Sequence, residues 1–163
     1  MYPNSNTKSY GFSNRQQDAN SNRFLAIYFL DKLTGSLLLS KEYSLNPNSG
    51  IDMDLIGGFL NALNLFIKEV KPGNKSEEIQ EINFDETRIL YERYGRLLVI
   101  AITRKTSLNV ERSILKQIVH DFYSRFEGSI NHFDGRIEPS ILKYKKRLEI
   151  TNFNVNFKHN FGF

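Results

Sequence analysis

One short stretch of the sequence, Gly73-Asn74-Lys75-Ser76, has the residue types of a phosphate-binding loop, in which glycine amides and a lysine surround a phosphate group. A complete loop of this kind needs an earlier glycine and follows a strand. Here that glycine is absent, and the preceding residues have a helical period. We therefore expect no phosphate loop.

Two pairs of residues have the chemistry of metal ligands. His120 precedes Asp121, and His132 lies two positions before Asp134. His120 adjoins the apolar stripe of a predicted helix, where a structural histidine is commoner than a ligand. The chain has no cysteine and no glycine-flanked serine nucleophile. We predict a protein without catalytic residues, metal or cofactor.

The positive charge is concentrated near the C-terminal end. Residues 136–163 hold six lysine or arginine side chains against two glutamates, which equals the net charge of +4, so residues 1–135 are neutral. The densest group, interrupted by Tyr144, is the anionic-surface candidate Lys143, Lys145, Lys146 and Arg147. It can be a solvated helix face, can attract anionic lipid, or can bind nucleic acid. A single tyrosine makes nucleic acid the least favoured of these.

Length and composition indicate one domain with two tails. Residues 1–22 are rich in Asn, Ser and Gln and predict a disordered arm. Residues 23–150 carry the periodic patterns of a folded domain, and 163 residues suffice for one hydrophobic core. We predict no element in the Asn- and Phe-rich tail at 151–163. Every apolar run is too short to cross a bilayer, so we expect a cytoplasmic protein whose membrane contact, if any, is peripheral.

Two strands are expected at the centre of a sheet. The predicted strands 23–31 and 96–104 contain uninterrupted apolar runs, which indicates burial on both faces. Three further strands are predicted at 36–43, 77–84 and 87–94. These carry polar or charged residues and should flank the central pair or form edges.

Two segments have a helical period. Residues 52–70 repeat apolar side chains at intervals of three and four, namely Ile56, Phe59, Leu60, Leu63, Phe66, Ile67 and Val70. Gly57 and Gly58 lie inside this helix, and we expect them to allow close packing on the sheet. A second helix is predicted at 109–126 with a stop at Gly128, and a short helix should begin at Pro139.

The order strand, strand, helix, three strands, helix, with a further short helix, resembles the longin fold of the longin/roadblock-like superfamily, in particular archaeal longin-like proteins. The segments that carry the resemblance are FLAIYFLDKLTGSLLLSKEY, DMDLIGGFLNALNLFIKEV, ILYERYGRLLVIAI and SILKQIVHDFYSRF. The resemblance implies an α+β domain with a five-stranded antiparallel sheet, the first and fifth strands in its middle, and helices on both faces.

The same resemblance implies interaction rather than catalysis. Longin domains act as scaffolds and as paired regulators of small Ras-like GTPases in trafficking-like systems. The expected partners are therefore a small GTPase, or another longin or roadblock protein in a homo- or heterodimer. Alternatives are peripheral membrane or nucleic-acid binding through the basic segment, and a small-molecule sensor.

Two sets of residues are candidates for binding a partner. Along the first predicted helix, which is apolar over more than one face, lie Leu55, Phe59, Ala62 and Phe66. On the third predicted strand, which we expect at an edge where its backbone can pair with another chain, lie Ile79, Glu81 and Asn83.

Overall fold

The computed structural model describes residues 23–43, 53–70 and 78–149. The elements in chain order are β1 (Phe24–Asp31), β2 (Leu37–Glu42), α2 (Met53–Val70), β3 (Glu81–Asn83), β4 (Thr87–Tyr94), β5 (Leu97–Arg104), α3 (Leu108–Asn131) and α4 (Pro139–Glu149). The arm predicted at 1–22, the tail at 151–163 and the stretch 73–76 lie outside the described residues.

The five strands form one antiparallel sheet in the order β2-β1-β5-β4-β3. β1 and β5 lie in its middle, as predicted from their apolar runs, and Phe29 of β1 pairs with Val99 of β5. Strands covered on both faces cannot alternate between apolar and polar side chains, which explains why these two are apolar throughout. β3 and β2 are the edges of the sheet.

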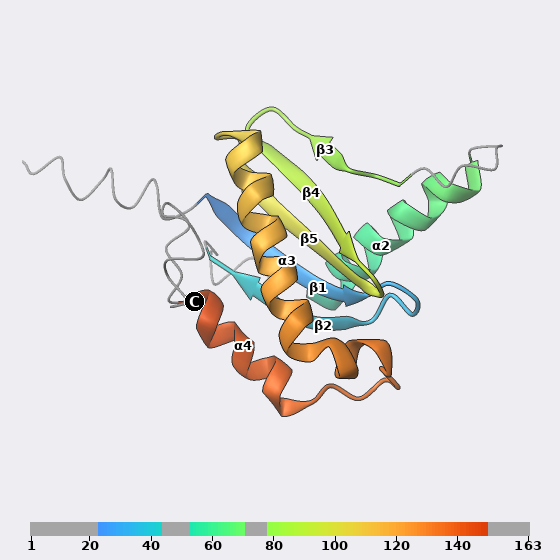
Figure 1. Cartoon of the computed structure of the whole chain (residues 1–163). Coiled ribbons are helices and arrows are strands. Elements are labelled where there is room, and N and C mark those ends of the chain that lie inside the picture. The colour runs from blue at the N-terminus through green and yellow to red at the C-terminus, as the bar shows by residue number, and fades with distance from the viewer. Residues whose placement is uncertain (1–22, 44–52, 71–77, 150–163) are drawn as a thin grey trace, which may run out of the picture.

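Helices cover both faces of the sheet, which confirms the predicted α+β layering. α3 and α4 lie on the face turned toward the viewer in Figure 1, whereas α2 lies behind the strands. On the first face, Phe29 of β1 packs against Phe122 of α3, with ring centroids 4.3 Å apart. On the second face, Tyr28 and Tyr91 are buried together with Leu60 of α2. Each face therefore has its own hydrophobic core.

α3 continues beyond its predicted end at Gly128. The backbone of Phe126 leaves helical geometry (φ −124°, ψ 21°), and the helix resumes as far as Asn131. The Gly128 carbonyl still accepts a hydrogen bond from the His132 N–H, at 3.0 Å. The kink lets the last turn bury Ile130, which is 1% exposed, so core packing and not the glycine decides where this helix ends.

β3 is shorter than the strand predicted at 77–84. Ile79 and Ile82 both pack against the core on the α2 face, although they are three positions apart. A continuous strand would place them on opposite faces, so the chain becomes extended only at Glu81.

None of the described helices is long and apolar enough to span a membrane.

Candidate partner-binding surface

α2 meets the sheet through a narrow face that contains two asparagines. Leu60, Asn61 and Asn64 are buried. The Tyr91 hydroxyl donates to the Leu60 carbonyl at 3.2 Å, and Nη2 of Arg93 donates to Oδ1 of Asn64 at 2.7 Å. These polar contacts fix the helix on the sheet and leave most of its apolar side chains on other faces.

The outward side of α2 is strongly apolar. Leu55, Phe59 and Phe66 are 71%, 64% and 60% exposed, and Leu65 and Val70 are about half exposed. We call the exposed residues Leu55, Phe59, Ala62, Leu65, Phe66 and Val70 the α2 surface. Surface clusters of apolar and aromatic side chains commonly mark protein–protein interfaces.

This orientation agrees with the placement that the predicted partner site requires. Phe59, Phe66 and Val70, which belong to the predicted apolar repeat, face outward, whereas Tyr28 and Tyr91 of the sheet are buried together with Leu60 of α2. The helix residues predicted to bind a partner are all exposed: Leu55, Phe59, Ala62 and Phe66. Leu65, which the periodicity did not single out, belongs to the same surface.

The second predicted partner site, on β3, is divided between the two faces of the sheet. Ile79 is half-buried on the α2 face. Glu81 faces α3, where Nη2 of Arg112 donates to its carboxylate at 3.1 Å, and Asn83 donates to the same carboxylate at 2.9 Å. These hydrogen bonds hold the pKa of the Glu81 carboxyl below its usual value, with that from Asn83 contributing most. β3 is an edge strand, as predicted, with Phe84 exposed just beyond it.

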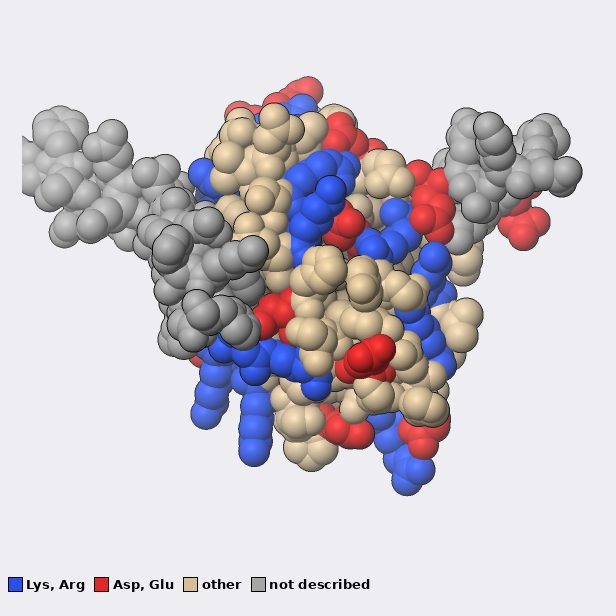
Figure 2. Space-filling model, in the orientation of Figure 1, with Lys and Arg blue, Asp and Glu red and all other residues tan. Residues whose placement is uncertain are grey.

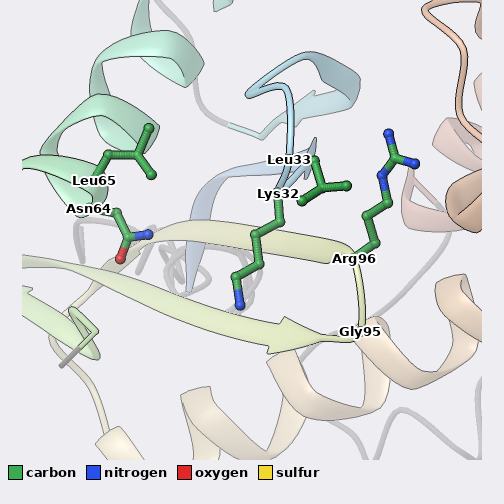
Figure 3. A pocket seen from close by; sticks show the side chains of 6 residues that line it. All are labelled: Lys32, Leu33, Asn64, Leu65, Gly95 and Arg96. Carbon is green, nitrogen blue, oxygen red and sulfur yellow. The ribbon is translucent and has the colours of Figure 1, made fainter. Parts of the chain in front are cut away.

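A cavity of about 530 Å³ adjoins α2 at the tips of two hairpins (Figure 3). Its lining residues are Lys32 and Leu33 from the β1–β2 hairpin, Asn64 and Leu65 from α2, and Gly95 and Arg96 from the β4–β5 hairpin. Lys32 is ion-paired with Glu78 at 3.2 Å, and Arg96 with Asp31. Because both cations have partners within the chain, the cavity offers mainly the apolar rim of Leu33 and Leu65, which extends the α2 surface.

The two hairpins are locked together by Asp31. Its side chain is fully buried and accepts hydrogen bonds from Nη2 of Arg96 at 3.1 Å and from the Thr34 backbone N–H at 2.9 Å. Burial opposes ionisation of Asp31, but the hydrogen bonds from Arg96 and Thr34 outweigh it and hold the pKa of the carboxyl below its usual value. Lys32 N–H also donates to the Arg96 carbonyl, so a backbone hydrogen bond joins the two hairpins as well.

The predicted basic group on α4 is only partly available to an anionic surface. Lys143, Lys145 and Lys146 are exposed, and Figure 2 shows basic side chains projecting from the position of α4. Arg147 instead donates to the buried Asp121, from Nε at 3.0 Å. Tyr144, counted above as part of the basic stretch, is buried and cannot stack on a base or enter a membrane.

The histidine and aspartate pairs do not converge. His120 is exposed and packs against Tyr94, with ring centroids 4.8 Å apart, whereas Asp121 points into the core. His132 contacts the carbonyl of its own helix at Gly128, and Asp134 is ion-paired with Arg136 at 2.8 Å. Within the described ranges, no group of three or more potential metal ligands comes together.

Comparison with known proteins bears on the architecture. No family model matches the chain, and no curated protein matches it by sequence. Among solved structures, Myxococcus xanthus MglB superimposes with a TM-score of 0.52 at 16% sequence identity, covering 72% of this chain and 98% of MglB. The fold is longin/roadblock-like. At this identity the likeness concerns the fold, so functional residues must be argued from the molecule itself.

Proposed function

We propose that the protein is a non-catalytic interaction module, a longin-type scaffold or regulator of a small Ras-like GTPase. It acts as a pair with a second longin- or roadblock-fold chain, identical or different, which docks on the α2 surface. The observation that carries this proposal is the outward apolar side of α2, where Leu55, Phe59 and Phe66 are each more than half exposed.

Geometry supports α2 as the docking element. Leu55, Phe59, Ala62 and Phe66 are spaced four, three and four residues apart, which places them on one side of the helix over about 16 Å. Two phenylalanines in such a row are suited to act as anchors, since aromatic side chains dominate interface energetics. The hydrogen bonds to Leu60 and Asn64 hold the helix in place before a partner arrives.

The state of the charged groups also favours binding over catalysis. The carboxylates of Asp31, Asp121 and Glu81 each accept hydrogen bonds from arginine within the chain. A general acid or base instead requires a titratable group directed toward a space where a substrate can bind.

The test is a pull-down from native cell extract with the folded protein as bait, followed by binding of the purified partner. Phe59→Asp/Phe66→Asp is compared with Val110→Asp, which adds a carboxylate to an exposed apolar position at the start of α3. We expect wild type and Val110→Asp to retain a small GTPase or a longin- or roadblock-fold protein, and the double variant to lose it.

Two results would contradict different parts of the proposal. If no small GTPase binds in either nucleotide state and no longin- or roadblock-fold protein is retained, the function is wrong. If such a partner binds the double variant as tightly as it binds Val110→Asp, the function stands and the α2 surface is not the docking site.

Contact with an anionic membrane is a second candidate function, favoured by the exposure of Lys143, Lys145 and Lys146 on one helix. These lysines can place a paired module on a membrane without occupying the α2 surface.

A further inference from the structure

A largely apolar groove lies between the edge strand β2 and α4. Its volume is about 260 Å³, and its lining includes Leu38 and Leu39 of β2, Ile137, and Leu142 and Lys145 of α4. Leu142 is 54% exposed and Ile137, just before α4, is 38% exposed, whereas Leu38 and Leu39 are buried. We call the exposed side chains of Leu142 and Ile137 the α4 rim. The described part of the chain leaves this rim uncovered.

The packing of α4 determines that Leu142 faces outward. Ile141, Tyr144 and Leu148 are buried in the core, and the Tyr144 ring lies edge-on to Phe122 of α3, with ring centroids 5.0 Å apart. Leu142 follows Ile141 by one position, a rotation of about 100° around the helix. It therefore cannot share the buried side while these three side chains fill it.

Three lysines surround Leu142 on the outward side of α4. Lys143 is its neighbour in sequence, and Lys145 and Lys146 lie three and four positions further along, one turn of the helix away. All three lysines are exposed, and within the described ranges none of them forms an ion pair. An apolar side chain and three available positive charges thus share one surface.

The acidic residues near this surface do not cancel its charge. Glu149 is ion-paired with Lys41 of β2 at 3.1 Å. Glu42 is partly buried, with its Oε1 atom out of contact with solvent. Glu138 lies one turn before Leu142, on the side away from the lysines. Figure 2 accordingly shows basic side chains projecting from the position of α4.

An exposed leucine among lysines matches an anionic membrane better than it matches other partners. Interfacial helices place apolar side chains at the acyl boundary while their lysines attract anionic lipid. Nucleic-acid bases would need exposed aromatic side chains, and Tyr144, the aromatic residue of α4, is buried. The α2 surface, proposed to bind a protein, instead exposes Phe59 and Phe66 and lies on the opposite face of the sheet (Figure 1).

We infer that the α4 rim is a membrane anchor. The side chains of Leu142 and Ile137 enter the boundary between lipid headgroups and acyl chains. Lys143, Lys145 and Lys146 contact the headgroups of anionic lipid. The inference rests on the second candidate function above, contact with an anionic membrane, and adds an apolar anchor to it. Salt does not screen the contribution of this anchor, because burial of apolar surface involves no charge.

The test measures binding of the full chain to vesicles made of equal parts of phosphatidylserine and phosphatidylcholine, at low and at high salt. Leu142→Ser should bind about fivefold more weakly than wild type, since the exposed half of the leucine side chain can no longer be buried. This ratio should be the same at both salt concentrations, whereas overall binding falls as salt screens the lysines. Val110→Ser, a matched change at an exposed apolar position at the start of α3, should bind as wild type does.

Because the chain has no cysteine, insertion can also be observed directly. A solvent-sensitive fluorophore attached through Ile137→Cys should shift its emission to shorter wavelength when the phosphatidylserine vesicles are added. The same fluorophore attached through Lys116→Cys, on the exposed side of α3, should not shift. Vesicles of phosphatidylcholine alone should leave both spectra unchanged.

The failures of the anchor and of the membrane function are distinguishable. If wild type does not bind the phosphatidylserine vesicles at low salt, the second candidate function is wrong, and the anchor with it. If wild type binds, but Leu142→Ser binds equally well or the fluorophore at position 137 does not shift, the lysines act alone and the anchor is wrong. If Leu142→Ser leaves vesicle binding unchanged and lowers retention of a protein partner, the groove is a protein-binding site instead.

Discussion

The Tyr144 hydroxyl donates a hydrogen bond to Asp121 over 2.7 Å and so joins α4 to α3 inside the core. Asp121 is 7% exposed and also accepts from Nε of Arg147 at 3.0 Å and from Nε of Arg125 at 3.1 Å. Burial, followed by the charge of Asp121, raises the pKa of Tyr144 and keeps its hydroxyl a donor. One carboxylate thus ties α4 to α3.

Replacing Asp121 with Ala should destabilise the protein by about 3 kcal/mol, because a buried hydroxyl and two arginines lose their acceptor. Tyr144→Phe removes only one hydrogen bond and should lower the free energy of unfolding by about 1 kcal/mol. Urea denaturation measures both, with Glu127→Ala on the exposed side of α3 as the control. Equal effects of Asp121→Ala and Glu127→Ala would show that the cluster does not hold α4.

Asp31 predicts a pH dependence of stability. Its folded pKa lies below its unfolded value of about 3.9, so its contribution is present above that pH and is lost as the pH falls through the folded pKa. Asp31→Asn should therefore lower the free energy of unfolding by about 2 kcal/mol at pH 7. The difference from wild type should shrink below about pH 4. Urea midpoints at several pH values test this.

Asp134→Asn is the matched control for this experiment. The pKa of Asp134 is also lowered, mainly by its hydrogen bond with Arg136, but the Arg136 side chain is 89% exposed. Exposed ion pairs contribute little to stability. If Asp134→Asn changes the pH profile as much as Asp31→Asn does, the buried lock between the hairpins is not the cause.

The sheet could be predicted from the sequence because its signals are local. The apolar runs of β1 and β5 identify the central strands without reference to any other residue, and the turn at Gly35 follows from its position between two strands. Its φ of +74° agrees with this placement. The Asp121 cluster could not be predicted in the same way. Tyr144 and Arg147 meet Asp121 from 23 and 26 positions away, so the basic stretch alone suggested a wholly exposed face.

The orientation of α2 could not be predicted from the sequence, for a different reason. A helix that is apolar over more than one face does not specify which side meets the sheet. The deciding residue is Asn64, whose side-chain oxygen is buried and accepts a hydrogen bond from Arg93, which is distant in sequence. This asparagine was the available signal, since a polar residue inside an apolar helix needs a partner when buried.

Different substitutions at Gly58 test the stability of the isolated chain and its binding to a partner separately. Unlike Gly57, whose added Cβ would lie 3.5 Å from Leu30, Gly58 has no described atom within 4 Å of that position, so the expected close approach to the sheet is absent there. Gly58→Ala should raise the free energy of unfolding by about 1 kcal/mol through helix propensity. Thermal or urea unfolding of the monomer measures this effect.

The same position tests the α2 surface. Gly58 is exposed one turn before Ala62, so a docked helix could approach closely at these two small residues. Gly58→Leu should leave the monomer folded and weaken association with the partner by about tenfold or more, as measured by sedimentation or calorimetry. Gly35→Ala is the contrasting variant: its Cβ would lie 2.6 Å from Nδ2 of Asn61 at a positive φ, so it should destabilise the monomer itself.

The lysines of α4 predict weak, salt-sensitive adhesion to anionic membranes. Each exposed lysine near such a surface contributes about 1 kcal/mol, so Lys143, Lys145 and Lys146 together supply only about 3 kcal/mol. The protein should sediment with anionic vesicles at low salt and not with neutral vesicles, which carry no charge to attract the lysines. Sedimentation should weaken at physiological ionic strength, because salt screens the attraction. Lys143→Glu/Lys146→Glu should abolish sedimentation, while Lys116→Glu on α3 should largely preserve it. Equal sedimentation with anionic and neutral vesicles would leave these lysines as a solvated helix face.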